Sequence, residues 1–406
     1  MATEDIDTLI IGGGQAGLAM SAHLREQGKP HLVIERHRIA ERWRSERWDS
    51  LVANGPAWHD RFPALDFDDI APDAFAPRDR IVQYFETFAA QIDAPIRCGV
   101  EVTELVQDGG GFVARTGDGA IRARNVVVAT GPFQKPLMPV MVPDYQGVTQ
   151  LHSNAYRNPA QLPPGAVLVV GAGSSGAQIA DELQRSGRKV YLSVGPHDRP
   201  PRAYRGHDFV WWLGVLGLWD ATAREPGKEH VTISVSGARG GHTVDFRDLA
   251  AGGITLLGRA HGFDGGKMRF QDDLARNIAE GDANYLSVLD TADAYAEAMA
   301  LDLPPEPQAR HFGPTPDCVT NPILELDLKA AGISTILWAT GFALDFGWIK
   351  ADAFDDKGRP RHDRGVATVP GLYFIGLPWL SRRASPFIWG AWHDAARLAQ
   401  HIAARG

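Results

Sequence analysis

Two glycine-rich turns, each placed between an apolar strand and a helix, predict an α/β protein with two Rossmann-like, dinucleotide-binding domains. The first turn lies in "DTLIIGGGQAGLAMSAHLREQGKPHLVIERH" and the second in "GAVLVVGAGSSGAQIADELQRSGRKVYLSVG". A third observation supports an internal repeat, because "NVVVATG" at 125–131 and "STILWATGF" at 334–342 are both apolar strands that end in Ala-Thr-Gly. Each half of the chain is therefore expected to hold one nucleotide.

The first turn has the full Gly-x-Gly-x-x-Gly spacing at Gly12, Gly14 and Gly17. The first glycine permits the tight turn, the second lets a pyrophosphate approach the helix N-terminus, and the third lets helix and strand pack closely. Glu35 ends the second strand, where a carboxylate can accept hydrogen bonds from ribose hydroxyls. The predicted cofactor-binding residues are Gly12, Gly13, Gly14, Gln15, Ala16, Gly17, Glu35 and Arg36.

The second turn repeats this spacing but differs at the end of its second strand. That strand runs into "YLSVGPHDRPPR", which has no acid at its tip and supplies Arg199 and Arg202 soon afterwards. An acid would repel a 2′-phosphate and arginines would attract one, so this site is predicted to take NADP rather than NAD. The alternative is that both arginines belong to a solvated loop. The predicted site residues are Gly171, Gly173, Ser174, Ser175, Gly176, Arg199 and Arg202.

Composition narrows the function classes. The chain has 406 residues, 44% of them hydrophobic and 22% charged, which predicts a globular protein of more than one domain. The formal net charge of −8 and the scattered Lys and Arg argue against a nucleic-acid surface. The N-terminus carries acids rather than a basic signal-peptide region, which predicts a cytoplasmic protein. "FVWWLGVLGLW" at 209–219 is too short to span a bilayer and is expected to be a buried or substrate-channel helix.

Only two cysteines occur, Cys98 and Cys318, so the chain has no Cys-x-x-Cys pair and no thiolate metal site. Redox chemistry must therefore come from a bound cofactor. Both cysteines are expected to be inert packing residues, and no metal ligand set is predicted.

Two dinucleotide turns, two Ala-Thr-Gly strands and no redox cysteines resemble the flavin-containing monooxygenases, including the plant-type indole-pyruvate monooxygenases, over nearly the whole chain. The resemblance implies FAD on the first turn and NADP(H) on the second. It also implies an FAD-binding domain into which an NADP-binding domain is inserted: residues 1–155 as the first part, 156–330 as the NADP-binding domain and 331–406 as the return segment. "GLYFIGL" near Gly376 is similar to the family strand that returns the chain to the flavin.

The stretch "YQGVTQLHSNAY" resembles the family signature Phe-x-Gly-x-x-x-His-x-x-x-(Phe/Tyr). Tyr145, Gly147, His152 and Tyr156 match it, but the spacing from Gly147 to His152 is one residue longer. The resemblance implies a segment that links the domains and shapes the NADP site. Alternatively, His152 caps a turn.

Two further matches precede the linker. "LVANGP" resembles the family segment whose asparagine reaches the reactive face of the flavin, which implies a catalytic role for Asn54; the alternative is a simple turn, which Asn-Gly-Pro favours. "ERWRSERWDS" resembles the family stretch that packs along FAD, and Trp43 is the residue assigned to that contact.

The resemblance implies an NADPH-dependent flavoprotein monooxygenase that forms a C4a-(hydro)peroxyflavin and oxygenates a small apolar or aromatic substrate with dioxygen. Eleven tryptophans are compatible with an apolar pocket. Two alternatives stay open: a flavin reductase that passes electrons from NAD(P)H to a carrier, and a non-catalytic flavin-bound sensor. A homodimer is compatible with the sequence.

Overall fold

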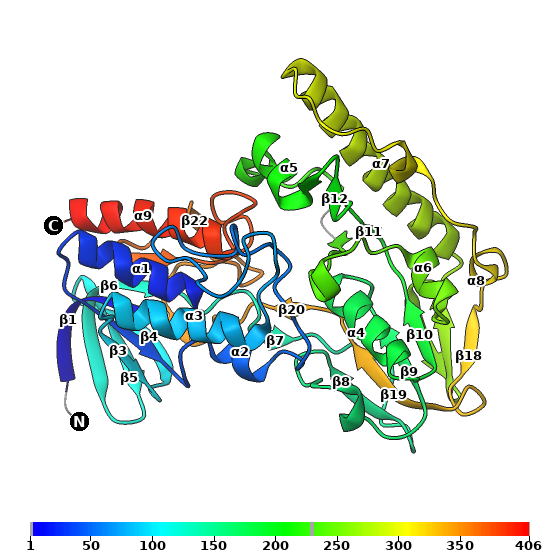
Figure 1. The fold of residues 1–406 in the computed structure, drawn as a ribbon. Coiled ribbons are helices and arrows are strands. Elements are labelled where there is room, and N and C mark those ends of the chain that lie inside the picture. The colour runs from blue at the N-terminus through cyan, green and yellow to red at the C-terminus, as the bar shows by residue number, and fades with distance from the viewer. Residues whose placement is uncertain (1–2, 228–230, 406) are drawn as a thin grey trace.

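The computed structural model describes residues 3–227 and 231–405, which form two lobes side by side (Figure 1). Both described ends of the chain lie in the first lobe, and the second lobe is built from the middle of the sequence. The predicted α/β class, with two Rossmann-like domains and one inserted into the other, is confirmed by the two separate sheets.

The first lobe is built on a mixed sheet of ten strands. β1 pairs in parallel with both β2 and β6, and β24 pairs in parallel with β6. The strands are β1 (Thr3–Ile11), β2 (His31–Glu35), β3 (Ile96–Cys98), β4 (Val102–Asp108), β5 (Gly111–Thr116), β6 (Ala120–Val128), β21 (Ile349–Lys350), β22 (His362–Asp363), β23 (Val366–Ala367) and β24 (Leu372–Phe374).

Both faces of this sheet are covered, which explains why its central strands are continuous apolar runs. Along β1, Ile10 lies in one core cluster, whereas Leu9 and Ile11 lie in the other, because successive side chains point to opposite faces. The helices α1 (Gln15–Glu26), α3 (Arg78–Gln91) and α9 (Ile388–Ala404) contribute to the cluster that contains Ile10. Figure 1 shows α1 and α9 side by side, so the two ends of the chain close the same layer.

The second lobe is built on a five-stranded parallel sheet, with α4 (Ser174–Arg185) packed against β9 and β10. The strand order is β15-β10-β9-β19-β8. The strands are β8 (Thr149–His152), β9 (Ala166–Val170), β10 (Val190–Ser193), β15 (Thr255–Leu257) and β19 (Ile333–Trp338).

This pairing moves both expected boundaries of the inserted domain outward. β8 and β19, which were expected in the first domain, pair with each other in parallel, and β19 also pairs with β9. The second sheet therefore extends beyond 156–330 to Thr149 and Trp338. The physical reason is that β9 needs a parallel partner on each side to satisfy its backbone hydrogen bonds.

Smaller elements connect and decorate the two sheets. They are α2 (Glu41–Ser45), β7 (Lys135–Pro136), η1 (Pro159–Gln161), β11 (His197–Asp198), β12 (Ala203–Tyr204), β13 (His207–Asp208), η2 (Leu218–Asp220), β14 (Thr232–Ile233), η3 (Ala238–Gly240), α6 (Phe246–Ala251), β16 (Ala260–Asp264), β17 (Lys267–Phe270), η4 (Pro307–Arg310), α8 (Asp317–Thr320), β18 (Glu325–Asp327) and β20 (Phe342–Ala343).

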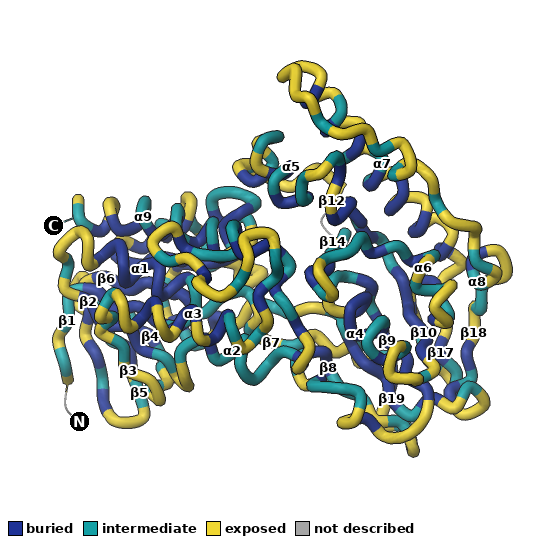
Figure 2. The backbone as a smooth tube through the Cα atoms, in the orientation of Figure 1, coloured by how far each residue is buried: buried dark blue, intermediate teal, exposed yellow. Residues whose placement is uncertain are grey.

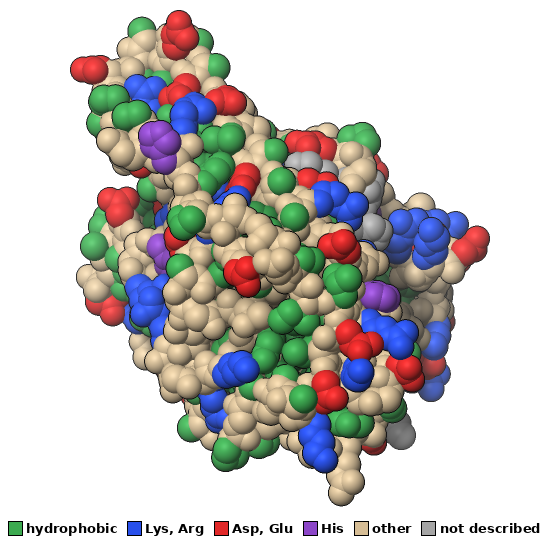
Figure 3. Space-filling model, turned by 90° about the vertical axis from the view of Figure 1, so that its right-hand side faces the viewer, with side chains coloured by type: hydrophobic (Ala, Val, Ile, Leu, Met, Phe, Trp, Pro, Cys, Tyr) green, Lys and Arg blue, Asp and Glu red, His purple; other side chains and the backbone are tan. Residues whose placement is uncertain are grey.

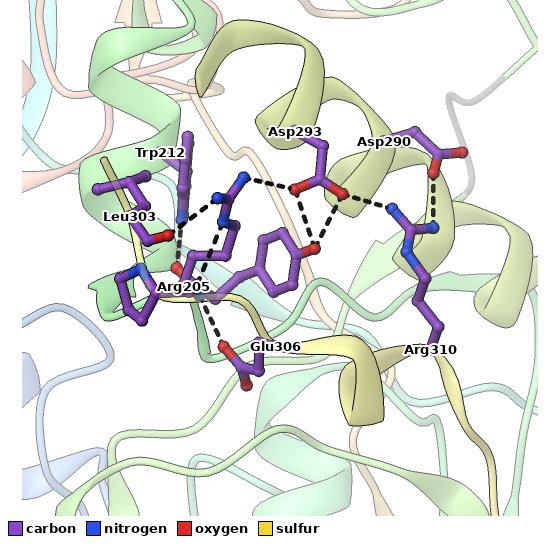
Figure 4. A network of polar contacts seen from close by, with 9 residues as sticks. Arg205, Trp212, Asp290, Asp293, Leu303, Glu306 and Arg310 are labelled. Atoms are coloured by element: carbon purple, nitrogen blue, oxygen red, sulfur yellow. Dashed lines mark hydrogen bonds and ion pairs between the residues drawn. The ribbon is translucent and has the colours of Figure 1, made fainter. Parts of the chain in front are cut away.

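A projecting arm rises from the second lobe and consists of α5 (Phe209–Val215) and the long helix α7 (Leu274–Ala298). A polar network holds α7 in place: Asp293 accepts hydrogen bonds from Tyr204 and pairs with both Arg205 and Arg310 (Figure 4). The far end of α7 is largely exposed in Figure 2, whereas Leu289 and Ala292 pack in a buried cluster with Trp212, so the network and this cluster together hold the helix.

The apolar stretch at 209–219 is a short buried helix followed by η2, as expected. Trp212 is fully buried and Trp219 is 6% exposed. Among the described helices, none is both long and apolar enough to cross a bilayer.

The two cysteines are free, and one of them corrects an expectation. Cys98 is exposed at the end of β3 rather than packed in a core, while Cys318 is half-buried. Partial burial and the nearby Glu35 carboxylate raise the pKa of the Cys98 thiol, which disfavours the reactive thiolate. Within residues 3–227 and 231–405, no three His, Cys, Asp or Glu side chains gather as a metal site.

The outer face of the second lobe carries basic and acidic side chains interspersed with each other (Figure 3). Such mixing differs from the single basic stripe that phosphate backbones select.

Candidate functional site

The first glycine turn joins β1 to α1, and two of its three fingerprint glycines, Gly12 and Gly17, are required by close packing. Gly12 has φ 118°, and a Cβ there would lie 2.6 Å from the carbonyl oxygen of Ala129. A Cβ on Gly17 would overlap the carbonyl oxygen of Gly12. At Gly14 nothing lies within 4 Å of the Cβ position, so the helix N-terminus faces open space. This geometry leaves room for a pyrophosphate.

Glu35 lies against this turn at the end of β2. Its Oε2 accepts a hydrogen bond from the backbone N–H of Gly13 at 2.7 Å, and its Oε1 accepts from the N–H of His37 at 2.9 Å. The carboxylate is thereby held beside the loop, where a ribose would pass. Arg36 does not lie beside the glycine turn. Its side chain is exposed, and its Nη1 lies 3.8 Å from Oε1 of Glu101.

The return segment meets the same turn, as the resemblance implied for Gly376. A Cβ on Gly376 would lie 2.8 Å from Cβ of Ala16, and Gln15 Nε2 donates a hydrogen bond to the carbonyl oxygen of Pro386 at 2.7 Å. Trp43 is half-buried and packs against core clusters of both lobes. The return segment therefore packs on the first turn, and α2 packs against the core cluster that contains Ala16.

The second glycine turn joins β9 to α4 and repeats the first turn in three dimensions. Gly171 has φ 108°, and a Cβ there would lie 2.5 Å from the carbonyl oxygen of Ala339. Ala129 and Ala339 are the alanines of the two Ala-Thr-Gly segments, so each segment packs against its own glycine turn. A Cβ on Gly176 would overlap the carbonyl oxygen of Gly171.

The segment 232–235 forms a wall directly beside the second turn. The Ser174 hydroxyl donates to the carbonyl oxygen of Ile233 at 3.0 Å and accepts from the N–H of Val235 at 3.1 Å. The buried Ser234 hydroxyl donates to the carbonyl oxygen of Ala172. Ser175 stays exposed. The sequence did not predict that residues 232–235 contact the second turn, because they follow it by some sixty residues.

The strand registers identify which residue of the second lobe corresponds to Glu35. Ile11 precedes the first turn and pairs with Ile34, the residue before Glu35. Val170 precedes the second turn and pairs with Ser193, the residue before Val194. Val194 is fully buried in an apolar cluster. The position that holds an acid in the first lobe therefore holds an apolar side chain in the second.

The two predicted phosphate-binding arginines are engaged elsewhere, which corrects the expectation that they are free to meet a nucleotide. Arg199 is 2% exposed and pairs with Asp282 at 2.5 Å. Arg202 pairs with Asp208 at 2.5 Å and donates to the carbonyl oxygen of Asn54 at 2.7 Å. A buried guanidinium requires such partners because an unpaired buried charge is strongly disfavoured.

The ion pair of Arg199 belongs to a larger buried cluster. Asp282 also accepts hydrogen bonds from Arg247, and the Arg199 guanidinium lies over the rings of Tyr285 and Phe312. Burial opposes ionisation of Asp282, but hydrogen bonds from both arginines hold its pKa below the ordinary value. The cluster joins the segment after β11 to α6 and α7.

Asn54 lies at the junction of the two lobes. Its Oδ1 accepts a hydrogen bond from Nε2 of Gln178 at 2.9 Å, and Gln178 is a buried residue of α4, two positions after Gly176. No described residue accepts a hydrogen bond from Asn54 Nδ2, so this donor is available to a ligand. Gln178 carried no sequence signal other than its place in the helix that follows the second turn.

The linker histidine His152 has a structural role, because it connects β8 to the segment after β19 through a hydrogen bond. It is 3% exposed, and its Nε2 donates to the carbonyl oxygen of Gly341 at 2.9 Å while its Nδ1 accepts from the N–H of Asn154. Burial lowers the pKa of His152, which favours this neutral form. Tyr156 donates to Glu182 on α4 at 2.7 Å, and burial together with that carboxylate raises the Tyr156 pKa. The segment thus fastens β8 to β19 and α4.

A histidine and an aspartate after the Asn-Gly-Pro turn also join the site, and sequence reasoning missed both. His59 Nδ1 lies 2.8 Å from Asp60 Oδ1, and Asp60 Oδ2 accepts from the N–H of Gly55 at 3.0 Å. A signal was present, since adjacent polar residues follow a turn rich in Gly and Pro, but neither burial nor contacts are visible in a sequence.

Comparisons with known proteins show which family the chain belongs to. A family model described as pyridine nucleotide-disulphide oxidoreductase matches residues 9–204. A CzcO-like oxidoreductase from Geobacillus kaustophilus is 34% identical over 98% of both chains. The indole-3-pyruvate monooxygenase YUCCA1 of Oryza sativa is 34% identical, but over 46% of this chain and 47% of its own length.

Solved structures share the fold at low sequence identity. The flavin-containing monooxygenase from Stenotrophomonas maltophilia superposes with a TM-score of 0.66 at 19% identity over 99% of both chains. The bacillithiol disulfide reductase from Bacillus cereus has a TM-score of 0.63 at 18% identity, covering 99% of this chain and all of its own. Because a relative 34% identical aligns along nearly the whole chain, the protein belongs to the family of CzcO-like oxidoreductases.

Proposed function

We propose that the protein is an NADPH-dependent flavoprotein monooxygenase that oxygenates a small apolar or aromatic substrate with dioxygen. The observation that carries the proposal is the hydrogen bond between Asn54 and Gln178. Asn54 follows Ala53, which shares a core cluster with Ala16 of the first turn, and Gln178 lies on the helix of the second turn. One contact thus links the two dinucleotide sites at a single junction.

The cofactors are FAD and NADP(H). The open first turn fits FAD, whereas at the second turn Thr232 Cβ lies 3.4 Å from the Cβ position of Gly173, so the segment 232–235 would have to shift for a pyrophosphate to bind there. Gly14 leaves open the space that an FAD pyrophosphate would fill at the N-terminus of α1, and Glu35 is held where its ribose would lie. On the second turn, Gly171 and Gly176 make the corresponding close packing. Val194 stands at the position of Glu35, so the carboxylate that would repel a 2′-phosphate there is absent.

When bound and reduced by NADPH, FAD would supply the oxygen-activating chemistry. The protein's own residues would position the reactants, donate hydrogen bonds to the reacting centre and keep water out of it. Asn54 Nδ2 would donate a hydrogen bond toward the reacting centre, while Gln178 holds the amide in its orientation. Trp219 contributes apolar surface from the second lobe. It is held next to the first lobe because its carbonyl oxygen accepts a hydrogen bond from the N–H of Ala384, which precedes α9. These contacts would exclude water from the junction.

The test is stopped-flow spectroscopy of the NADPH-reduced protein mixed with oxygen, with and without NADP, combined with oxygen uptake and product analysis. A monooxygenase incorporates one oxygen atom of O₂ into a product. Turnover of NADPH that requires an added electron carrier and leaves no oxygen in any product would establish a reductase instead. Absence of turnover with every acceptor would indicate a flavin-bound sensor.

A further inference from the structure

The two glycine turns differ at the position where a pyrophosphate would approach the backbone. At Gly14, the middle glycine of the first turn, nothing lies within 4 Å of the Cβ position. At the matching Gly173, Thr232 Cβ lies 3.4 Å and the carbonyl oxygen of Ile233 3.8 Å from the Cβ position. The middle glycine of this fingerprint is where the backbone and the pyrophosphate come closest. The segment 232–235 therefore covers at the second turn the space that is open at the first.

The segment also takes up a donor that a phosphate would use. Ser174 is the first residue of α4, and its hydroxyl donates to the carbonyl oxygen of Ile233 at 3.0 Å. The same hydroxyl accepts a hydrogen bond from the N–H of Val235 at 3.1 Å. Helix N-termini bind phosphate groups through donors of the first turn. A peptide carbonyl oxygen thus occupies the place of an anionic oxygen at the N-terminus of α4.

Hydrogen bonds on several sides hold the segment in this position. The carbonyl oxygen of Val235 accepts from Nε2 of Gln178 at 2.7 Å. Ser234 is fully buried, and its hydroxyl donates to the carbonyl oxygen of Ala172. The N–H of Ser234 donates to the carbonyl oxygen of Asp198 at 2.9 Å. Each of these bonds can be exchanged for one to water or to a ligand at a small net cost.

Apolar packing contributes little to holding the segment. Thr232 is exposed, and the side chain of Ile233 is 37% exposed. None of the described residues 231–236 belongs to a hydrophobic core cluster. Segments with few buried apolar contacts open locally at a low free-energy cost. The segment can therefore move while the sheet beneath the second turn stays folded.

We propose that the segment 232–235 closes the second nucleotide site in the free protein and is displaced when NADP(H) binds. The pyrophosphate would then accept the hydrogen bond that Ser174 donates to Ile233. Because only the open form can bind, the closed form lowers the apparent affinity for NADP(H) in proportion to the open fraction. This inference rests on NADP(H) binding at the second turn, and it is independent of the reaction with oxygen.

Hydrogen–deuterium exchange of the full-length, FAD-loaded protein with and without saturating NADP tests the movement. The amides of Ser234 and Val235 donate to the Asp198 carbonyl oxygen and to Ser174 Oγ, so displacement should make both exchange faster when NADP is bound. Leu192 in the middle of the sheet is the control and should keep its slow exchange. Slower or unchanged exchange at 234 and 235 with NADP bound would overturn the proposal.

A variant tests the energetic consequence. Ser234→Ala removes the hydroxyl that bonds to Ala172, so the open fraction should rise and the Kd for NADP should fall by about threefold to tenfold. Ser193→Ala is the matched control, because the Ser193 hydroxyl is also buried and donates to a backbone carbonyl of the same lobe, that of Gly258. It should keep the native Kd. Unchanged or weaker binding in Ser234→Ala would contradict the proposal.

The Kd values are measured by isothermal titration calorimetry of the oxidised protein, with flavin content as the check on folding. NADP that binds without faster exchange in the segment would refute the displacement and leave the cofactor assignment intact. Failure of both the native protein and Ser234→Ala to bind NADP would refute the two together. Faster exchange in a protein that oxygenates nothing would support the displacement and refute only the monooxygenase function.

Discussion

At the scale of single residues, two glycines of the first turn are expected to respond differently to substitution. Gly14→Leu places a side chain in open space where the pyrophosphate would lie, so the variant should fold but not retain FAD. Gly12→Ala would bring a Cβ to 2.6 Å from the carbonyl oxygen of Ala129 at φ 118°, so it should destabilise the fold itself.

Flavin absorbance per protein and thermal melting in the flavin-free state separate these two effects. Gly14→Leu should lose the flavin with an unchanged melting temperature, whereas Gly12→Ala should lower that temperature by about 2–3 °C for each 2 kcal/mol lost. A Gly14→Leu protein that purifies with a full complement of FAD would show that the pyrophosphate lies elsewhere.

Asn54 is the residue on which coupling is expected to depend. Asn54→Leu keeps the approximate size but removes the amide, so NADPH oxidation should continue while more of it ends as hydrogen peroxide. One lost donor corresponds to about a tenfold change in coupling. The ratio of oxygenated product to NADPH consumed, with peroxide measured in parallel, is the observable.

Gln178→Leu is the matched variant, because it breaks the same hydrogen bond from the other side. If Asn54 acts only as part of an interdomain turn, both variants should behave alike. If its Nδ2 donates to the reacting centre, Asn54→Leu should release clearly more peroxide than Gln178→Leu. An unchanged coupling ratio in Asn54→Leu would assign the residue to a structural turn.

At the scale of elements, the buried cluster of Arg199, Asp282 and Arg247 fastens the segment after β11 to α6 and α7. Arg199→Gln leaves the buried carboxylate of Asp282 with Arg247 as its remaining arginine partner. Breaking a buried pair costs about 3–5 kcal/mol when the remaining charge is left without a partner. Arg247 still pairs with Asp282, so the free energy of unfolding should fall by less than that, by about 1–3 kcal/mol.

Arg276→Gln on the same helix α7 is the control, since Arg276 is 66% exposed and its nearest carboxylate oxygen is 3.8 Å away. That change should cost less than about 1 kcal/mol. Arg199→Gln should also affect NADPH and NADH alike, because the guanidinium is bound to Asp282. A selective rise in the KM for NADPH would show that Arg199 exchanges partners to meet the 2′-phosphate.

At the scale of the whole molecule, the two lobes both carry a glycine turn between a strand and a helix, and they differ chemically at the end of the next strand. Glu35 ends the second strand of the first lobe, and Val194 takes the corresponding place in the second. Without an acid there, the native protein should use NADPH with a higher kcat/KM than NADH. Steady-state kinetics with both nucleotides at equal oxygen concentration checks this, and equal use of the two would contradict it.

Much of this architecture was predictable because its signals are local. The glycine spacing, the apolar strands and the two Ala-Thr-Gly segments each depend on neighbours along the chain, and all of them fold as expected around Gly12 and Gly171. Domain boundaries were less predictable, since β8 and β19 join the second sheet through pairing between residues far apart in sequence.

By itself, the sequence determined the α/β class, the two nucleotide turns and the absence of a redox cysteine pair. Only the tertiary structure decided what the remaining polar residues do. Arg199 looked free in sequence but is buried against Asp282, and Ser174 looked open to a nucleotide but is hydrogen-bonded to the segment 232–235. The reason is that burial and pairing are set by contacts between distant segments, and these contacts decide which polar groups are left to meet a ligand.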